Sequence, residues 1–186
     1  MLMMFAFLSV EFNGRELLKS AKEIPRCGKC GWPIDKWSVS VDDKTILKSD
    51  ISSSADGFIM VSPKFKAIYE GDALEGCSFR ELPNGHFVLV IHRAIQFDED
   101  TLNLTKRGKC DACGKYEEMF GAANAPKIAA QEPLIKPTEI VRSHLEYPLL
   151  IDGVGGFYKI IVGDRVREVF LASGFGAKAF QKISDS

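Results

Sequence analysis

The sequence CGKCG at residues 27–31 occurs again in related form, as CDACG, at residues 110–114. Each copy is a Cys-x-x-Cys pair followed by a glycine, which lets the backbone leave a tight turn with a positive φ. Two thiolates at this spacing reach one ion from one turn, and a closed structural zinc site takes four such ligands. The two copies therefore predict one Zn2+ bound by Cys27, Cys30, Cys110 and Cys113.

Other interpretations of the cysteines are weaker. A Cys-x-x-Cys pair can be a redox centre, but that chemistry needs one motif and no following glycine. Disulfides need an oxidising compartment, which nothing in the sequence indicates, and a third alternative is a site that has lost its metal. The 79 residues between Cys30 and Cys110 exceed the about 15–20 of a compact zinc ribbon. We therefore expect a whole subdomain between the two motifs.

The composition is that of a soluble globular protein, with 46% hydrophobic and 26% charged residues. A chain of 186 residues can bury a sizeable core, so we expect one zinc-containing domain over residues 1–186. The net charge is −1 and no concentrated basic stretch is present, which makes a nucleic-acid partner unlikely on composition.

The apolar residues 1–10 lack the basic region and cleavage site of a signal peptide. No run approaches the about 18 apolar residues of a membrane span. We expect a cytoplasmic protein that is not bound to a membrane. Its first elements are predicted as a buried strand at 3–12, a helix at 15–24, a strand at 37–41 and a loop at 48–57.

The clearest local pattern begins with a short apolar strand at residues 58–61. Ser62 is a good N-cap, and Pro63 suits the first helical position, where no amide donor is needed. Apolar residues then recur at helical spacing, and Gly71 is expected to end the helix. A hairpin follows, with strands at 77–82 and 86–91 around the type I′ turn signal Asn84-Gly85, the second strand running towards Phe97.

After the second motif the pattern is weaker. Residues 116–148 contain four prolines and little periodicity, which predicts a long loop with a short helix near 139–144. Strands are expected at 149–151 and 157–162, separated by a glycine-rich turn.

Residues 61–82 align without a gap on residues 162–183, at an offset of 101 positions. Asp164 is expected to cap the second helix, and Gly174 to end it. Only two aligned residues are identical, so common supersecondary patterns could also produce the match. The expected fold is α+β, with two strand–helix–strand units and antiparallel hairpins joined by a zinc-ribbon-like site. Each cysteine motif would precede one unit, which gives two candidate halves, 1–109 and 110–186.

Other residues that carry chemistry do not form a recognisable active site. His86 and His92 lie six positions apart on a predicted strand, about 20 Å apart and too far to share an ion. Cys77 is expected to be a small buried apolar residue. The glycines at 153–156 precede a strand, whereas phosphate loops precede a helix. The acidic run at 98–100 is expected to be a solvated loop of the kind that proteins use to bind basic partners.

The two motifs, an early strand and the closing pattern IIVGDRVREVF-x3-GF-x4-F resemble the bacterial double-CXXCG motif family. The resemblance covers both motifs and about the last 25 residues of the chain. It implies an immunity-type protein, not an enzyme, that neutralises a cognate toxin encoded nearby by binding to it. The family's motif cysteines correspond to the same four cysteines.

Three functions therefore follow from the sequence. The first is the zinc-binding immunity-type protein, which has a protein partner. The second is a zinc-ribbon nucleic-acid-binding or transcription-associated module, which a basic stripe beside the motifs would favour. The third is a redox protein that uses its Cys-x-x-Cys pairs.

Overall fold

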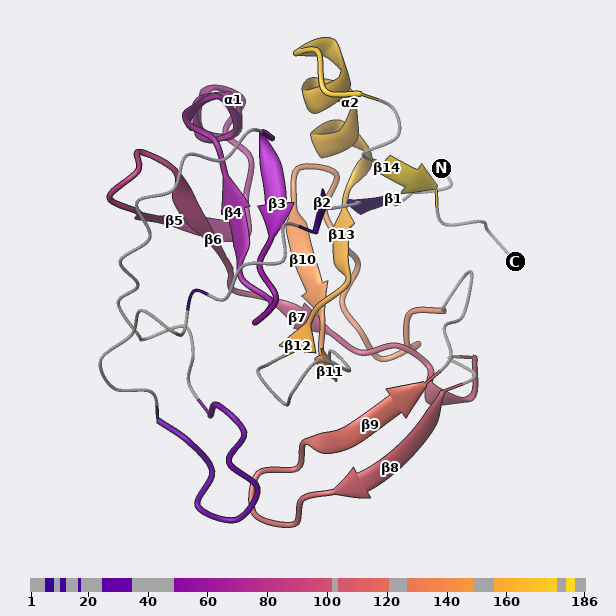
Figure 1. Ribbon diagram of the computed structural model, residues 1–186. Helices are drawn as coiled ribbons and strands as arrows, with labels where there is room; N and C mark the ends of the chain where they lie inside the picture. The colour runs from indigo at the N-terminus through magenta and orange to yellow at the C-terminus, as the bar shows by residue number, and fades with distance from the viewer. Residues whose placement is uncertain are drawn as a thin grey trace.

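The computed structural model describes residues 6–8, 11–12, 17, 25–34, 49–101, 104–120, 127–148, 156–176 and 180–182 (Figure 1). Within these ranges the chain is mostly strand, with helices α1 (Pro63–Gly71) and α2 (Asp164–Ala172). The α+β class is confirmed, and both strand–helix–strand units are present.

The described residues form two larger sheets, each of five strands. The first sheet has the order β2-β3-β4-β6-β5, and its pairs are antiparallel except for the parallel pair β2·β3. Its strands are β2 (Glu11–Phe12), β3 (Ile51–Ser53), β4 (Ile59–Val61), β5 (Cys77–Glu81) and β6 (Phe87–Ile91).

The second sheet has the order β14-β1-β13-β10-β7, and here β10·β7 is the parallel pair. Its strands are β1 (Ala6–Leu8), β7 (Ala94–Ile95), β10 (Ile140–Ser143), β13 (Ile160–Val162) and β14 (Phe180–Lys182). Figure 1 shows α1 and α2 next to each other at one end of the molecule, above the two sheets.

Two shorter ribbons complete the described part of the chain. β8 (Thr105–Lys109) and β9 (Tyr116–Phe120) form an antiparallel hairpin at the end of the molecule opposite the helices (Figure 1). β11 (Tyr147–Pro148) pairs with β12 (Gly156–Phe157), and a 3-10 turn, η3, covers Glu99–Thr101.

The chain passes from one sheet to the other at two places that the sequence suggested were continuous strands. β1 pairs in the second sheet and β2 in the first, so the predicted strand 3–12 is in fact two strands. Likewise β6 ends at Ile91, and β7 pairs with β10 in the other sheet. Both expectations were wrong because an apolar run shows that a strand is buried but does not name its pairing partner.

The main core lies between the two sheets and beneath the helices. On β4, Ile59 and Val61 face this central cluster, whereas Met60 faces a separate cluster on the other side of the sheet. β13 alternates in the same way, since Ile160 and Val162 are central and Ile161 is not. Each sheet therefore buries both faces, which explains why these strands read as continuous apolar runs.

Helix α1 begins as its sequence predicts. Ser62 has extended backbone angles and its Oγ accepts the amide of Phe65 at 3.2 Å, with Pro63 in the first turn. The helix ends at Gly71 as predicted, but the residue that turns left-handed comes later: Asp72 is the C-cap and Ala73 has φ +50°. A glycine therefore occupies a position that needs no positive φ, and an alanine occupies the one that does.

Helix α2 begins differently from its prediction. Gly163 is the N-cap and Asp164 lies in the first turn, so Asp164 does not cap the helix. A Cβ at Gly163 would lie 2.3 Å from the carbonyl oxygen of Lys136 and 2.4 Å from that of Pro137. The Pro137 carbonyl instead accepts a hydrogen bond from the amide of Val166 at 3.2 Å. The backbone of this loop therefore replaces a capping side chain. The predicted Gly174 C′ position is confirmed, with φ +86°.

Three further expectations are corrected. The predicted loop 48–57 contains strand β3, and the predicted helix 139–144 is strand β10, whose Ile140 and Val141 are fully buried between two sheet partners. The hairpin between β5 and β6 is present, but its turn is not type I′, because Gly85 has φ +79° while Asn84 has no positive φ. The turn closes around residues 83–85, with the amide of Leu82 donating to the carbonyl of His86.

The predicted helix at 15–24, apart from Leu17, and the strands at 37–41 and 149–151 lie outside the described residues. Leu17 is buried in the cluster on the outer face of the first sheet. Neither described helix is long and apolar enough to cross a membrane.

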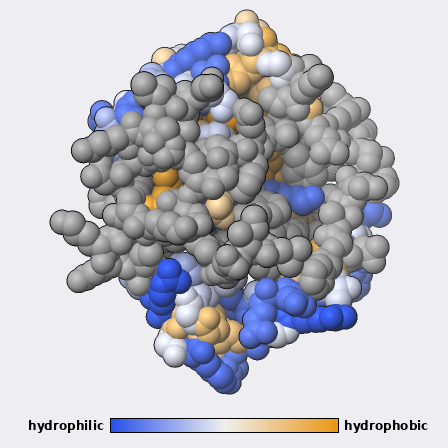
Figure 2. Space-filling model, in the orientation of Figure 1, coloured by the Kyte–Doolittle hydropathy of each residue, from blue (hydrophilic) through white to orange (hydrophobic). Residues whose placement is uncertain are grey.

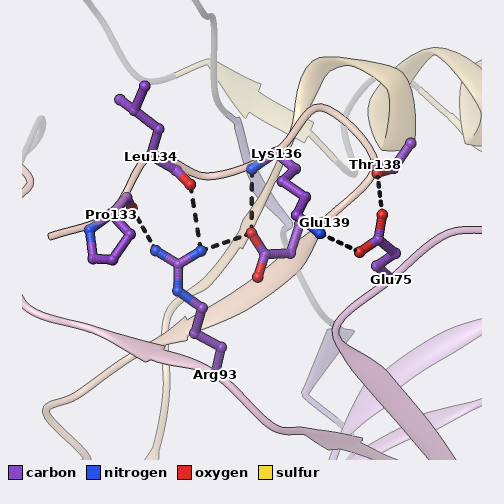
Figure 3. Close-up of polar contacts among 7 residues, drawn as sticks. All are labelled: Glu75, Arg93, Pro133, Leu134, Lys136, Thr138 and Glu139. Atoms are coloured by element: carbon purple, nitrogen blue, oxygen red, sulfur yellow. Dashed lines mark hydrogen bonds and ion pairs between the residues drawn. The ribbon is translucent and has the colours of Figure 1, made fainter.

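A polar network anchors the segment that precedes β10 (Figure 3). The Arg93 guanidinium, located where the chain passes from β6 to β7, donates to the Glu139 carboxylate at 2.8 Å and to the carbonyls of Pro133 and Leu134. Beside it, Lys136 lies 2.7 Å from Glu75. Because Glu139 is almost fully buried, Arg93 supplies the charge partner that a buried carboxylate requires.

Candidate metal centre

The first cysteine motif, residues 27–31, is a tight turn between the bridged residues Arg26 and Pro33. The amide of Gly31 donates to the carbonyl of Cys27 at 2.8 Å, and the amide of Cys27 donates to that of Trp32 at 2.8 Å. Gly31 has φ +73°, and a Cβ there would meet nothing within 4 Å. The glycine is therefore needed for its backbone conformation and not for lack of space.

The second cysteine motif, residues 110–114, repeats this geometry at the tip of the β8–β9 hairpin. The amide of Gly114 donates to the carbonyl of Cys110 at 2.7 Å, and the amide of Cys110 donates to that of Lys115 at 2.8 Å. Gly114 also has φ +73°. The two turns thus present their sulfurs in the same way from distant parts of the chain.

The four predicted ligand residues come together, with all four sulfurs within 4.8 Å of one another. Two sulfur pairs cross between the motifs, at 3.9 Å for Cys27 and Cys110 and 3.6 Å for Cys30 and Cys113. A tetrahedron of sulfurs about 2.3 Å from a zinc ion has edges of about 3.8 Å. These cysteines can therefore hold a metal ion of that size, and the donor set is complete with four sulfurs.

Backbone polarity favours the thiolate form at Cys27. The amides of Cys30 and Lys29 donate towards the Cys27 sulfur and lower the pKa of its thiol to about 6. Burial and the neighbouring thiols instead raise the pKa of Cys30 to about 12 and also raise that of Cys113. Cys27 and Cys110 are buried together with Trp32, whereas Cys30 is exposed. The indole thus shields one side of the cluster from water, which strengthens electrostatic attraction to a cation.

Ion pairs hold the cluster from two directions. Lys29 of the first motif lies 2.5 Å from Asp111 of the second, so the turns are also linked at their exposed surface. Lys115, just after the second motif, lies 2.7 Å from the buried Glu146, which also accepts the Tyr158 hydroxyl. These contacts connect the hairpin to the chain around β11 and β13.

A pocket of about 150 Å³ lies against the sulfur cluster. Its walls include Trp32 and Tyr116. The ammonium groups of Lys106 and Lys109 lie over the ring of Tyr116, at 5.5 and 5.8 Å from its centre. The lower part of the molecule in Figure 2, where this hairpin lies, is largely hydrophilic with a small apolar area.

The remaining candidates do not join this cluster among the described residues. His92 is exposed, and a ring nitrogen of His144 lies 3.2 Å from the carbonyl of Ile95. Cys77 packs at the edge of the main core, and burial raises the pKa of its thiol to about 12, as expected of an inert apolar residue. Of the glycine run 153–156, residues 153–155 lie outside the described part.

The acidic run beginning at Asp98 overlaps η3 and is paired with the proline-rich stretch. Phe97 forms a bridge with Ile128, and the amide of Asp98 donates to the carbonyl of Lys127 at 2.8 Å. The two segments are about 30 residues apart in the sequence, which carries no sign of their pairing. Only the fold shows that they share one surface.

Sequence reasoning missed Trp32, Glu146 and the β8–β9 hairpin. Trp32 directly follows the first motif, and that adjacency was the available signal. Glu146 is 33 residues beyond Cys113 and carries no local signal, because its role depends on Lys115 meeting it in space.

Comparison with known proteins finds no family model and no curated protein that matches this chain. The fold and the site therefore define it as an α+β protein with a four-cysteine cluster that can bind a metal ion.

Proposed function

We propose that the four cysteines bind one Zn2+ with a structural role. The observation that carries this proposal is the set of four sulfurs within 4.8 Å, contributed by two turns of matching geometry. Four thiolates complete the tetrahedral shell and leave no position for water or substrate, as in structural zinc sites. A redox role for separate Cys-x-x-Cys pairs is less consistent with this cluster, because the sulfurs of one pair also contact those of the other, at 3.9 and 3.6 Å.

Elemental analysis of protein purified without added metal tests this proposal, with about one zinc per chain expected. Cys110→Ser should lose the metal, whereas Cys77→Ser, the matched control outside the cluster, should retain it. Protein that contains no zinc and two disulfides would contradict the proposal.

We further propose that the protein acts by binding another protein, as an immunity-type protein that neutralises a cognate bacterial toxin. The support is the resemblance carried by the two motifs and a surface suited to a basic partner. That surface combines the acidic run at 98–100 with residues 127–134, which are held together by the Phe97–Ile128 bridge. It also includes Leu134, whose side chain is 75% exposed. Acidic residues of this kind increase association rates with basic partners.

Co-expression with the product of the neighbouring gene tests the immunity proposal. Wild type should allow survival, and reversal of residues 98–100 to lysine should weaken protection while zinc content and melting stay nearly unchanged. A matched control reverses three exposed acids elsewhere, Glu70, Glu81 and Glu168, and should protect like wild type. A harmless neighbouring product, or wild type that gives no protection, would defeat the proposal.

A nucleic-acid-binding role is the second candidate, favoured by one specific observation. β8 carries Lys106, Arg107 and Lys109 beside the second cysteine motif, next to the aromatic ring of Tyr116. Basic side chains around an aromatic ring are a common way to bind single strands. Binding of a single-stranded oligonucleotide that weakens steeply with salt, and weakens further in Arg107→Ala/Lys109→Ala, would support this role over the first. Absence of binding at low salt would rule it out.

A further inference from the structure

The two helical units of the chain match position by position in the fold. β4 and α1 cover residues 59–61 and 63–71, and β13 and α2 cover residues 160–162 and 164–172, 101 positions later. The hydrogen bonds at the C-terminal ends of the two helices also correspond. The amide of Leu74 donates to the carbonyl of Tyr69, and the amide of Phe175 donates to the carbonyl of Phe170. The match extends to the left-handed residue after each helix, at 73 and 174.

The two five-stranded sheets of the described residues match strand for strand when β1 and β6 are treated as equivalent. The orders β2-β3-β4-β6-β5 and β7-β10-β13-β1-β14 then coincide, and each places its one parallel pair at the same edge. The registers coincide as well. Phe87 of β6 pairs with positions 61 and 81, and Ala6 of β1 pairs with positions 162 and 182. The partners of Ala6 therefore lie 101 positions after the partners of Phe87.

The two cysteine motifs also occupy equivalent positions relative to the two sheets. They lie 83 positions apart, each between a parallel edge strand and the next strand of the same sheet, and they share their turn hydrogen bonds and their glycine φ. The bridge between Arg26 and Pro33 corresponds to the pair Lys109 and Tyr116. The sulfur pairs 27/110 and 30/113 are therefore pairs of equivalent residues.

In each helix the second residue contacts the C-terminal end of the other helix. Lys64, the second residue of α1, lies over the ring of Phe175, just beyond the end of α2. Its equivalent Arg165, the second residue of α2, bonds Asp72 at the end of α1 at 3.0 Å. The contacted positions, 175 and 72, are not themselves equivalent, but in both cases the start of one helix meets the end of the other, as expected when two similar units pack about an approximate two-fold axis.

We propose that the chain consists of two copies of one module, fused at the turn Asn84-Gly85, which exchange their first strands and share the metal centre between them. The first copy contains β1 to β5 and the second β6 to β14, with the β8–β9 hairpin belonging to the second cysteine motif. Each module is thus built to pack against a second copy of itself. This boundary, at residues 84–85, differs from the boundary after residue 109 that the sequence suggested. The shared metal centre rests on the zinc site proposed above.

A circular permutant tests the module boundary. The full chain is opened between Asn84 and Gly85, and residue 186 is joined to residue 1, which reverses the order of the modules. Because residues 182 and 6 pair in register, as 81 and 87 do, the joined ends replace the turn that was cut. The control permutant is opened between Ala130 and Gln131, an exposed turn inside the second module.

The module-boundary permutant should melt in one cooperative transition and at a higher temperature than the control. Equal melting, or a more stable control, would overturn the proposed boundary. This comparison uses melting alone, so it decides the duplication even if wild type were to bind no zinc and the proposed function were to fail.

The second arm measures zinc affinity in the four single Cys→Ser variants. The proposal predicts that losses group by equivalent position, with variants at Cys27 and Cys110 agreeing within about threefold, and likewise those at Cys30 and Cys113. If the losses group by motif, with Cys27 resembling Cys30, the metal centre is not shared symmetrically and that part of the proposal is wrong.

Discussion

At the scale of single residues, the N-cap positions of α1 and α2 are equivalent, but their helix amides are satisfied by different groups. Ser62 caps α1 through its hydroxyl, which also donates to Asp50 at 2.6 Å. At the start of α2 a serine cannot fit, since the backbone of the 136–137 loop occupies the space that its Cβ would need. A capping preference inferred from sequence is therefore valid only where no other chain segment covers the helix end.

Two substitutions test this difference. Ser62→Ala should lower the free energy of unfolding by about 1 kcal/mol through loss of the cap. Gly163→Ser, although it introduces a better capping residue, should also destabilise by about 1–3 kcal/mol because backbone atoms must move to admit the side chain. Denaturant unfolding measures both, and a stabilised Gly163→Ser would contradict the packing argument.

Phe170 links both halves of the core. Its ring centre lies 4.4 Å from that of Phe65 and 5.0 Å from that of Phe175, and its side chain is fully buried. Phe170→Ala should cost about 3–5 kcal/mol. Leu134→Ala, at a largely exposed leucine, is the control and should change stability by less than about 0.5 kcal/mol. Equal effects in urea melts would mean that Phe170 does not lie in the core.

At the scale of elements, the two helices end in the same geometry with different residues. Ala73 and Gly174 both have positive φ, at +50° and +86°. An alanine in this conformation costs about 1–2 kcal/mol, partly offset by the about 0.5–1 kcal/mol that glycine loses in unfolded-chain entropy. The end of α1 is thus less favourable than the end of α2.

The exchange of these residues should have opposite effects. Ala73→Gly should raise the free energy of unfolding by about 0.5–1 kcal/mol, and Gly174→Ala should lower it by a similar amount. Thermal melts of the two variants beside wild type give the sign directly. Changes of the same sign in both would show that backbone strain does not determine these positions.

At the scale of the whole molecule, the metal cluster and the main core are separate. The core lies between the sheets and beneath the helices, whereas the cysteines pack with Trp32 in a cluster of their own. A cross-link between positions 83 apart contributes about 4–5 kcal/mol in the chain-entropy description, because it restricts the unfolded chain.

Removal of the metal with a chelator should therefore lower the melting temperature but leave the helices folded. Amide hydrogen exchange should speed up at Gly31 and Gly114, whose amides close the two turns, while the amides of α1 and α2 stay protected. The same treatment of Cys110→Ser should change nothing. Uniform loss of protection across the chain would show that the sheets do not hold without the metal.

The sequence by itself determined the features whose cause lies within a few residues. The cysteine set follows from motif spacing, α1 from its cap and apolar periodicity, and the β5–β6 hairpin from the turn signal Asn84-Gly85 between two strand-forming segments. In the helix and the hairpin the interacting atoms are close in the chain, and each half of the cysteine set is a local turn, so the sequence pattern predicts the structure.

Only the tertiary structure decided which sheet each strand joins. Ala6 pairs with Val162, and Ile140 is a strand residue because it also pairs with Val162, although its surrounding segment reads as loop or helix. Gly163 replaces a capping residue because a loop from 136–137 crosses it. These outcomes depend on contacts between residues far apart in the chain, and local propensity is too weak to specify them where distant burial and hydrogen bonding favour another arrangement.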